Sequence, residues 1–141
     1  MAATLRVGMA GLGAGARQVL PSFKQVEGVE LAAVADVRPG ALDEFADRGV
    51  RTFTSVEAMC KSSDVDAVWI ATPNVLHMEH ALLAANNGKH VICEKPMALN
   101  LDQAQSMVDA VDKNAALAAW KRSNPERAAE WKRERADDPD R

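Results

Sequence analysis

The feature that most constrains the fold of this chain is a regular alternation of short apolar runs with longer amphipathic segments. In the longer segments apolar residues recur three and four positions apart, which is typical of helices that cover one face of a sheet. The short runs are predicted to be buried strands: residues 5–10, 29–35, 50–54, 66–71 and 90–93. Right-handed crossovers between such strands give an α/β fold, a doubly wound parallel sheet with helices on both faces.

Residues that favour helix ends bound the predicted helices. Ser55 and Asn100 have side chains suited to cap a helix N-terminus, and Gly28 and Gly88 are expected to terminate the helices before them. Pro21 lies inside the first helical pattern, so that helix is expected to be kinked or to start late. The predicted helices cover residues 19–26, 40–48, a short stretch after residue 55, residues 75–87, and residue 100 to about residue 111.

The character of the sequence changes near its C-terminus. Residues 115–119 fit either one more short strand or a helix, and beyond them acidic and basic residues are mixed around Trp120 and Trp131. Pro125 interrupts any helix there, and the residues after it can form a short charged one. We expect one domain over residues 1–120 and a charged, poorly ordered tail over residues 121–141.

Composition and charge narrow the class of protein. Hydrophobic residues make up 48% of the 141 positions and charged residues 26%, a balance typical of one globular domain with a modest core. The formal net charge of −3 gives no basis for binding nucleic acid or a membrane surface. Cys60 and Cys93 are too few for a disulfide framework, and no apolar stretch approaches the length of a membrane span, so we expect a cytoplasmic protein.

A glycine-rich turn follows the first predicted strand. Gly11, Gly13 and Ala16 have the G-x-G-x-x-A spacing of the fingerprint that binds dinucleotides in Rossmann folds. The first glycine permits a tight turn, the second lets the backbone approach a diphosphate, and the small third residue lets helix and strand pack closely. Because the motif lies between a predicted strand and a predicted helix, a dinucleotide site is favoured over a purely structural glycine turn.

An acidic residue follows the second predicted strand, about 20 positions after the fingerprint. Asp36 can accept hydrogen bonds from both hydroxyls of the adenosine ribose and would repel a 2′-phosphate, which favours NAD. Arg38 can instead pair with that phosphate or stack on adenine, so NADP remains an alternative. A turn-forming acid ahead of Pro39 is the alternative for Asp36.

Polar segments follow the fourth and fifth predicted strands, at the edge where open α/β sheets bind ligands: Thr72-Pro73-Asn74 and Glu94-Lys95-Pro96. Lys95 can position the nicotinamide or hold a substrate hydroxyl while its hydrogen leaves as hydride; the alternative is a solvent-exposed lysine. His77 and His80 lie three positions apart on one helix face. Their order is not that of a zinc-binding helix, so we expect no metal and assign His77 to the cofactor side.

Together these motifs resemble the glucose-fructose oxidoreductase, inositol dehydrogenase and rhizopine-catabolism (Gfo/Idh/MocA) family over about residues 5–112. The resemblance rests on the fingerprint, Ala35-Asp36, residues 71–74 with His77, and the block over residues 88–98 that contains Glu94-Lys95-Pro96. It implies that Lys95 is catalytic, at the nicotinamide and the substrate. It implies cofactor contacts at Gly11, Leu12, Gly13, Asp36, Arg38, Thr72, Asn74 and His77. Ala16, Pro73, Glu94 and Lys95 complete the predicted cofactor-binding set.

The resemblance also implies a second α/β domain, which in the family supplies substrate contacts, a catalytic histidine and the oligomer interface. The 141 residues do not extend into such a domain, so whether the chain is itself an enzyme stays open. The first hypothesis is an NAD(P)-binding domain of an oxidoreductase that transfers hydride between nicotinamide and a hydroxyl of a sugar, cyclitol or related compound. On this hypothesis the chain is truncated, is inactive alone and meets its substrate only if a second domain is supplied.

Two further hypotheses stay open. One is a non-catalytic dinucleotide-binding module or partner subunit, with Trp120 and Trp131 in its docking segment. The other is a product of a frameshift or early stop that has no function. The sequence predicts neither the substrate nor the oligomeric state.

Overall fold

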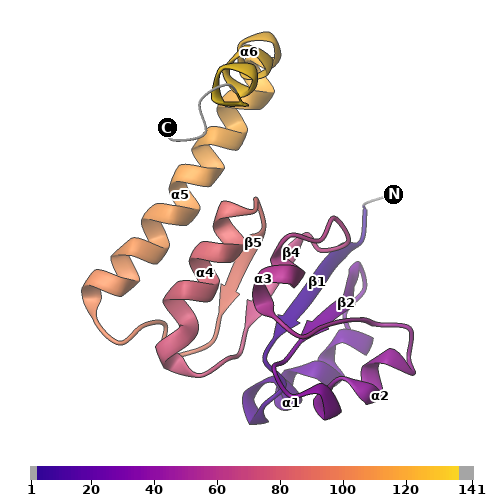
Figure 1. The fold of residues 1–141 in the computed structure, drawn as a ribbon. Coiled ribbons are helices and arrows are strands. Elements are labelled where there is room, and N and C mark those ends of the chain that lie inside the picture. The colour runs from indigo at the N-terminus through magenta and orange to yellow at the C-terminus, as the bar shows by residue number, and fades with distance from the viewer. Residues whose placement is uncertain (1–2, 137–141) are drawn as a thin grey trace.

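All five predicted strands are present in the computed structural model, which describes residues 3–136. They are β1 (Leu5–Ala10), β2 (Val29–Ala35), β3 (Arg51–Phe53), β4 (Ala67–Ile70) and β5 (His90–Cys93). The strands form one parallel sheet in the order β3-β2-β1-β4-β5 (Figure 1). Ala10 of β1 lies opposite Ala35 of β2 and Ile70 of β4, so the carboxyl ends of these strands meet at one edge of the sheet.

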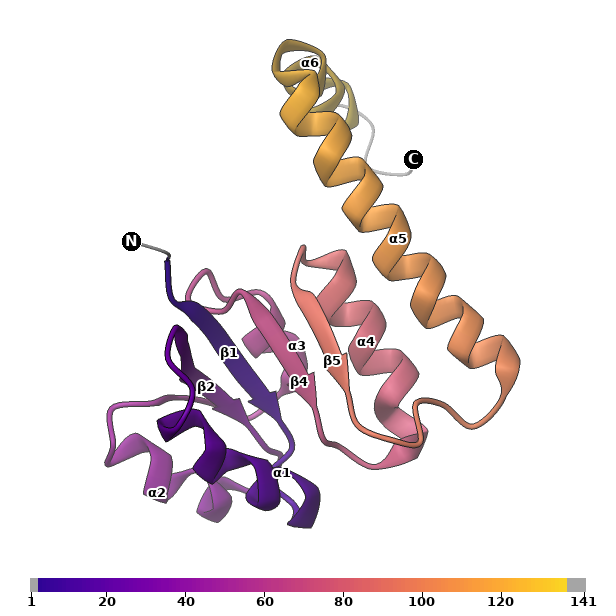
Figure 2. The ribbon, with the colours of Figure 1, turned by 180° about the vertical axis from the view of Figure 1, so that it is seen from behind.

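Helices cover both faces of this sheet. The α-helices are α1 (Ala14–Val19), α2 (Asp43–Ala46), α3 (Val56–Cys60), α4 (His77–Asn86), α5 (Leu101–Ser123) and α6 (Pro125–Ala136). Short 3-10 turns are η1 (Leu20–Lys24), η2 (Pro39–Ala41) and η3 (Asn74–Leu76). α1 and α2 lie on one face of the sheet, and α3, α4 and α5 lie on the other (Figures 1 and 2). The predicted doubly wound α/β fold is confirmed.

Alternation of side chains along the strands builds one core on each face. Met9 and Val34 point toward α1 and α2 and pack in a cluster with Leu12, Ala16 and Phe45. Their strand neighbours point the other way, toward α3, α4 and α5, and this second cluster contains Ala10, Ala35, Met59, Ala81, Ala84 and Met107. Burial of each large apolar side chain contributes about 1.5–3 kcal/mol, so the two cores hold the strand ends in place.

The first helical segment is interrupted near Pro21, as expected, although it begins at Ala14 and so does not start late; the second segment is more broken than predicted. α1 ends at Val19, and the chain continues as η1 with Pro21 near its start. Proline lacks a backbone N–H and cannot continue the α-helical hydrogen-bond ladder, which explains the change. The segment predicted as one helix over residues 40–48 divides into η2 and α2.

α5 is much longer than predicted. It runs to Ser123 rather than to about residue 111, so residues 115–119 are helical and the expected domain boundary at residue 120 lies inside a helix. Its N-terminal and middle parts pack on α4, where the Asn114 side-chain amide donates to Oδ1 of Asn86 at 3.2 Å, and its C-terminal part extends past the sheet (Figure 2). Pro125 begins α6, a position where its missing N–H costs nothing.

Side chains in the C-terminal helices are only partly described. Trp120 is half-buried, and the side chain of Trp131 lies outside the described part of the chain. None of the helices within residues 3–136 combines the length and the apolar character needed to cross a bilayer.

Candidate functional site

A cavity of about 650 Å³ opens at the carboxyl edge of the sheet, where the chain leaves β1, β2 and β4. This edge is the topological switch point, since β1 connects outward to β2 on one side and pairs with β4 on the other. The lining residues come from the β1–α1 loop, the end of β2, the start of α3, the end of β4 and α4: Gly11–Gly13, Ala35–Arg38, Thr54–Glu57, Ala71–Pro73, Leu76, Glu79, His80 and Leu83.

The glycine loop forms one wall of the cavity. Gly11 has a φ of +86°, and a Cβ built there would lie 2.9 Å from the backbone oxygen of Ala71, so a side chain is excluded by both conformation and space. A Cβ built on Gly13 meets nothing within 4 Å, which leaves its backbone open to the cavity. Ala16 does not line the cavity; it is buried in the core beneath α1, where its small size lets the helix approach the sheet.

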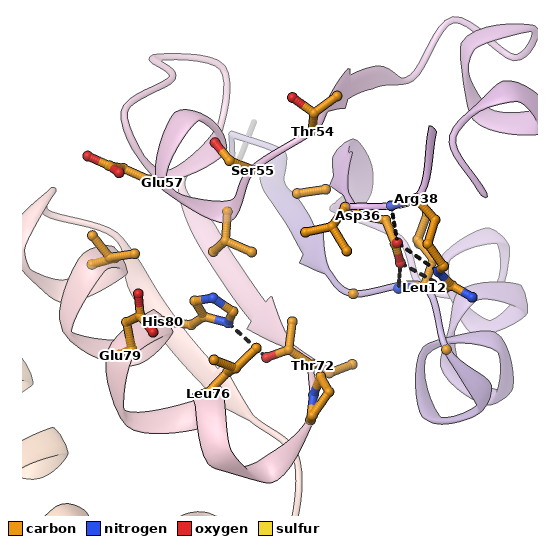
Figure 3. Close-up of a pocket in the computed structure, with 18 residues that line it drawn as sticks. Leu12, Asp36, Arg38, Thr54, Ser55, Glu57, Thr72, Leu76, Glu79 and His80 are labelled. Carbon is orange, nitrogen blue, oxygen red and sulfur yellow. Dashed lines mark hydrogen bonds and ion pairs between the residues drawn. The ribbon is translucent and has the colours of Figure 1, made fainter. Parts of the chain in front are cut away.

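Asp36 lies at the end of β2, beside the glycine loop, and is 8% exposed. Its Oδ2 accepts from the backbone N–H of Leu12 at 2.9 Å, and its Oδ1 accepts from the backbone N–H of Arg38 at 2.9 Å. The Arg38 guanidinium also donates to both carboxylate oxygens, each at 2.9 Å (Figure 3).

These contacts keep the Asp36 carboxylate ionised. Hydrogen bonding from the Arg38 side chain holds the pKa of Asp36 well below its usual range, against the opposing effect of burial. The same pairing raises the pKa of Arg38. The Arg38 side chain is 63% exposed, whereas that of Asp36 is 7% exposed.

Thr72 and His80 form a second polar group on the cavity wall. The Thr72 hydroxyl lies 2.8 Å from Nδ1 of His80, a side chain that is 9% exposed, and the rest of the ring faces the cavity (Figure 3). Burial lowers the pKa of His80, partly opposed by the Glu79 carboxylate. His80 is not among the site residues predicted from the sequence. His80 is four positions after Leu76 and three before Leu83, a spacing that puts all three on one helix face and could have predicted its place on the cavity wall.

His77 is turned away from the cavity. Its side chain is 1% exposed, with Nε2 at 2.8 Å from the backbone oxygen of Thr72 and Nδ1 at 2.9 Å from that of Pro96. Carbonyl oxygens only accept, so the ring donates from whichever nitrogen carries the proton. His77 therefore links the loop after β4 to the loop after β5.

The loop after β5 lies beside the cavity rather than on its lining. The backbone N–H of Glu94 donates to the carbonyl of Ile70 at 3.0 Å, and Nε1 of Trp69 donates to Oε1 of Glu94 at 3.0 Å. Lys95 follows at the carboxyl edge of the sheet with an exposed side chain, and its peptide bond to Pro96 is cis.

The structure thus divides the predicted site residues into two groups. Those on the cavity lining are Gly11, Leu12, Gly13, Asp36, Arg38, Thr72 and Pro73. Those beside it, in the core or on neighbouring loops, are Ala16, Asn74, His77, Glu94 and Lys95. Within residues 3–136, no three or more His, Cys, Asp or Glu side chains are grouped so that they could hold a metal ion.

The chain matches the family described as "Oxidoreductase family, NAD-binding Rossmann fold" (GFO_IDH_MocA) over residues 5–121. It is 40% identical over 105 residues to 1-carboxy-3-chloro-3,4-dihydroxycyclohexa-1,5-diene dehydrogenase of Comamonas testosteroni, a match that covers 73% of this chain and 26% of that protein. It is 38% identical over 100 residues to scyllo-inositol 2-dehydrogenase (NADP(+)) of Bacillus subtilis, covering 70% of this chain and 30% of that protein.

Solved structures show the same relationship. Scyllo-inositol dehydrogenase of Lactobacillus casei, solved with NAD(H) and scyllo-inositol, superposes with a TM-score of 0.74 at 28% identity, covering 80% of this chain and 34% of that one. A 3-ketoreductase of Actinomadura kijaniata, solved with NADP and TDP-benzene, gives a TM-score of 0.74 at 31% identity, covering 79% and 35%. The chain spans about a quarter to a third of the length of the relatives it matches.

Proposed function

Because this chain belongs to the Gfo/Idh/MocA oxidoreductases and forms their NAD-binding Rossmann domain, we propose that its cavity binds the adenosine and diphosphate of a nicotinamide dinucleotide. The observation that carries the proposal is the position of Asp36 directly beside an open glycine loop, with its Oδ2 2.9 Å from the backbone nitrogen of Leu12. Gly13 leaves room for a diphosphate, and Asp36 supplies the acceptor that ribose hydroxyls need. The residues present therefore fit the cofactor.

NAD is the proposed preferred cofactor, with NADP as a weaker ligand. An ionised Asp36 repels a 2′-phosphate, which favours NAD. Arg38 is exposed and adjacent, so its guanidinium can pair with that phosphate once it leaves Asp36. The relatives support both possibilities, since the L. casei enzyme was solved with NAD(H) and the B. subtilis enzyme is named for NADP(+).

Lys95 is the proposed catalytic residue. A ribose held at Asp36 and a diphosphate at the glycine loop leave the nicotinamide half to extend past β1 toward β4 and β5, where Lys95 lies. When bound, the nicotinamide supplies the hydride donor or acceptor. The amino group of Lys95 would hold and polarise the oxygen of a sugar or cyclitol, the class of compound named for the relatives. Glu94 and His77 hold the loop that carries it.

Dinucleotide binding is the activity assigned to these 141 residues, because they match about a quarter to a third of the relatives' length. Hydride transfer to a polyol is proposed to need contacts beyond the matched part. A panel of polyols and sugars, followed at the reduced-nicotinamide absorbance band, should therefore show no turnover by this chain alone. Turnover would show instead that the substrate site is complete within it.

Calorimetric titration with NAD and NADP tests the binding function. We expect Asp36→Ala to weaken NAD about 30-fold, roughly 2 kcal/mol, because hydrogen bonds to a charged acceptor are lost. The affinity for NADP should fall less, because the variant also removes the repulsion between the Asp36 carboxylate and the 2′-phosphate. Asp66→Ala is the matched control.

Asp66 is suited to this control because it makes the same kind of contacts at the other edge of the sheet. It accepts from the backbone N–H of Arg6 and from both ends of its guanidinium, at 2.8–3.0 Å. Asp66→Ala should change dinucleotide affinity by less than about twofold. The proposal is contradicted if the folded wild-type chain binds neither dinucleotide at millimolar concentration.

A further inference from the structure

The cavity extends past Asp36 into a recess between α3 and α4. Val56, Leu76 and Leu83 give this recess apolar walls, and all three side chains are half-buried. Across it from Asp36 lies His80, one turn along from Leu76 (Figure 3). A flat ring with apolar faces and polar edges fits a recess of this composition.

His80 presents a fixed nitrogen to the recess. Its Nδ1 lies 2.8 Å from the Thr72 hydroxyl, and no residue in the described range 3–136 hydrogen-bonds Nε2. Thr72 is itself held, because its backbone oxygen lies 2.8 Å from Nε2 of His77. No buried side-chain nitrogen or oxygen among residues 3–136 lacks a hydrogen-bond partner, so Nε2 is open to the cavity rather than enclosed in the core. A ring nitrogen held in place on a cavity wall is positioned to bond a ligand atom.

We propose that His80 recognises the edge of the purine base of the bound dinucleotide, an inference that rests on the binding function proposed above. With the diphosphate at the glycine loop and the ribose at Asp36, the base attached to that ribose enters the recess next. Nε2 donates to a purine ring nitrogen when the Thr72 hydroxyl donates to Nδ1. In the opposite tautomer Nε2 accepts from the exocyclic amino group.

The charge state of His80 supports a base as its partner. Burial lowers the pKa of His80, which favours the neutral ring near neutral pH, although the Glu79 carboxylate acts in the opposite direction. A neutral imidazole suits an uncharged purine, whereas a phosphate prefers a cation such as the Arg38 guanidinium. His80 and Arg38 would thus read different parts of the same nucleotide.

Calorimetry on the 141-residue chain with four ligands tests this: NAD, ADP-ribose, nicotinamide mononucleotide and nicotinamide hypoxanthine dinucleotide. His80→Leu should bind NAD and ADP-ribose about tenfold more weakly than wild type, because one hydrogen bond to the base is lost. Nicotinamide mononucleotide lacks the purine and should bind both chains equally. The wild-type preference for NAD over its hypoxanthine analogue should shrink toward none in His80→Leu.

Two further variants control this experiment. His80→Gln should recover most of the affinity, because an amide also donates and accepts hydrogen bonds. His90→Leu removes an exposed histidine of β5 and should match wild type for every ligand. If His80→Leu does not fold, the imidazole nitrogen shifts of wild-type His80 decide the question. They should move with ADP-ribose and stay in place with nicotinamide mononucleotide.

Three results overturn the inference. A folded His80→Leu chain that binds ADP-ribose as tightly as wild type removes the role of His80 but leaves dinucleotide binding intact. An equal loss for ADP-ribose and the mononucleotide assigns His80 a structural role instead. A wild-type chain that binds none of the adenine-containing ligands overturns the proposed function and this inference together.

Discussion

The two ends of the proposed dinucleotide site are built differently. At the adenosine end, Asp36 and His80 are 8% and 9% exposed, and each is held by hydrogen bonds from a different part of the chain. At the nicotinamide end, only the loop is held: Trp69 and His77 fix the residues on either side of Lys95, whose own side chain is exposed. The proposed recognition groups are therefore preorganised by this chain, whereas the proposed catalytic lysine is placed but not oriented by it.

The largest expected effect comes from closing the glycine loop. Gly11→Ala forces a side chain into a positive-φ position and into the backbone of Ala71, which should cost about 1–3 kcal/mol of folding free energy. The melting temperature should then fall by roughly 5–10 °C, and NAD binding should be lost.

Gly13→Ala is the matched control, because nothing lies within 4 Å of its added methyl group. It should keep the wild-type melting temperature but bind NAD more weakly, since the methyl group occupies space proposed for the diphosphate. Thermal unfolding of the two variants measures the backbone strain at residue 11, and calorimetry measures the crowding of the proposed diphosphate at residue 13. Equal behaviour of the two variants would contradict the placement of the diphosphate.

The next effect should be largest at the nicotinamide end. His77→Ala removes the link between the carbonyls of Thr72 and Pro96 and should cost about 2 kcal/mol of folding free energy. Hydrogen exchange should speed up at the amides of Lys95 and Met97, while the amides of the glycine loop keep their protection. Slower or unchanged exchange at Lys95 would show that other contacts hold this loop. His90→Ala, at an exposed position, is the control.

A smaller effect should separate the two dinucleotides at the adenosine end. Arg38→Ala leaves Asp36 without its guanidinium and removes the proposed partner of a 2′-phosphate, so NADP should bind about tenfold more weakly. NAD should change by no more than about threefold, because Asp36 stays available to the ribose. Arg48→Ala, an exposed arginine paired with Glu44 outside the cavity, is the control. An equal loss for both dinucleotides would assign Arg38 to the adenine or the fold.

Much of this comparison could be predicted from the sequence. Strand positions followed from short apolar runs, because buried parallel strands must be apolar on both faces, and the fingerprint followed from the steric demands on Gly11. The phase of α4 was harder to predict, since a small rotation decides whether His77 or His80 faces the cavity. Sequence spacing put both on one face, but the ring of His77 points to the loop after β5.

Residue spacing in the sequence does not predict two other features, the contact between Arg38 and Asp36 and the length of α5. The hydrogen bonds from Arg38 to Asp36 join residues two positions apart in an extended turn, and they depend on the local backbone geometry. α5 continues past residue 111 because its alanine-rich stretch has high helix propensity and meets no proline until Pro125. Sequence periodicity alone left residues 115–119 open between strand and helix.

Two lysines that bracket β5 give the smallest but sharpest test of the difference between the ends. Nζ of Lys89 donates to the carbonyls of Ser62 and Val65, each at 2.6 Å, so Lys89→Ala should cost about 1–2 kcal/mol of folding free energy. Lys95→Ala removes an exposed side chain and should change the free energy of unfolding by less than about 0.5 kcal/mol.

The affinities of Lys95→Ala for ADP-ribose and NAD should then show that Lys95 lies at the nicotinamide end. ADP-ribose, which lacks the nicotinamide, should bind Lys95→Ala and wild type equally, while NAD should lose up to about threefold because one contact near the nicotinamide is removed. Thermal unfolding and calorimetry of the two lysine variants check both statements. If Lys95→Ala destabilises the fold as much as Lys89→Ala, Lys95 is part of the scaffold. The proposed contrast between a preorganised adenosine end and an unoriented reactive lysine would then be wrong.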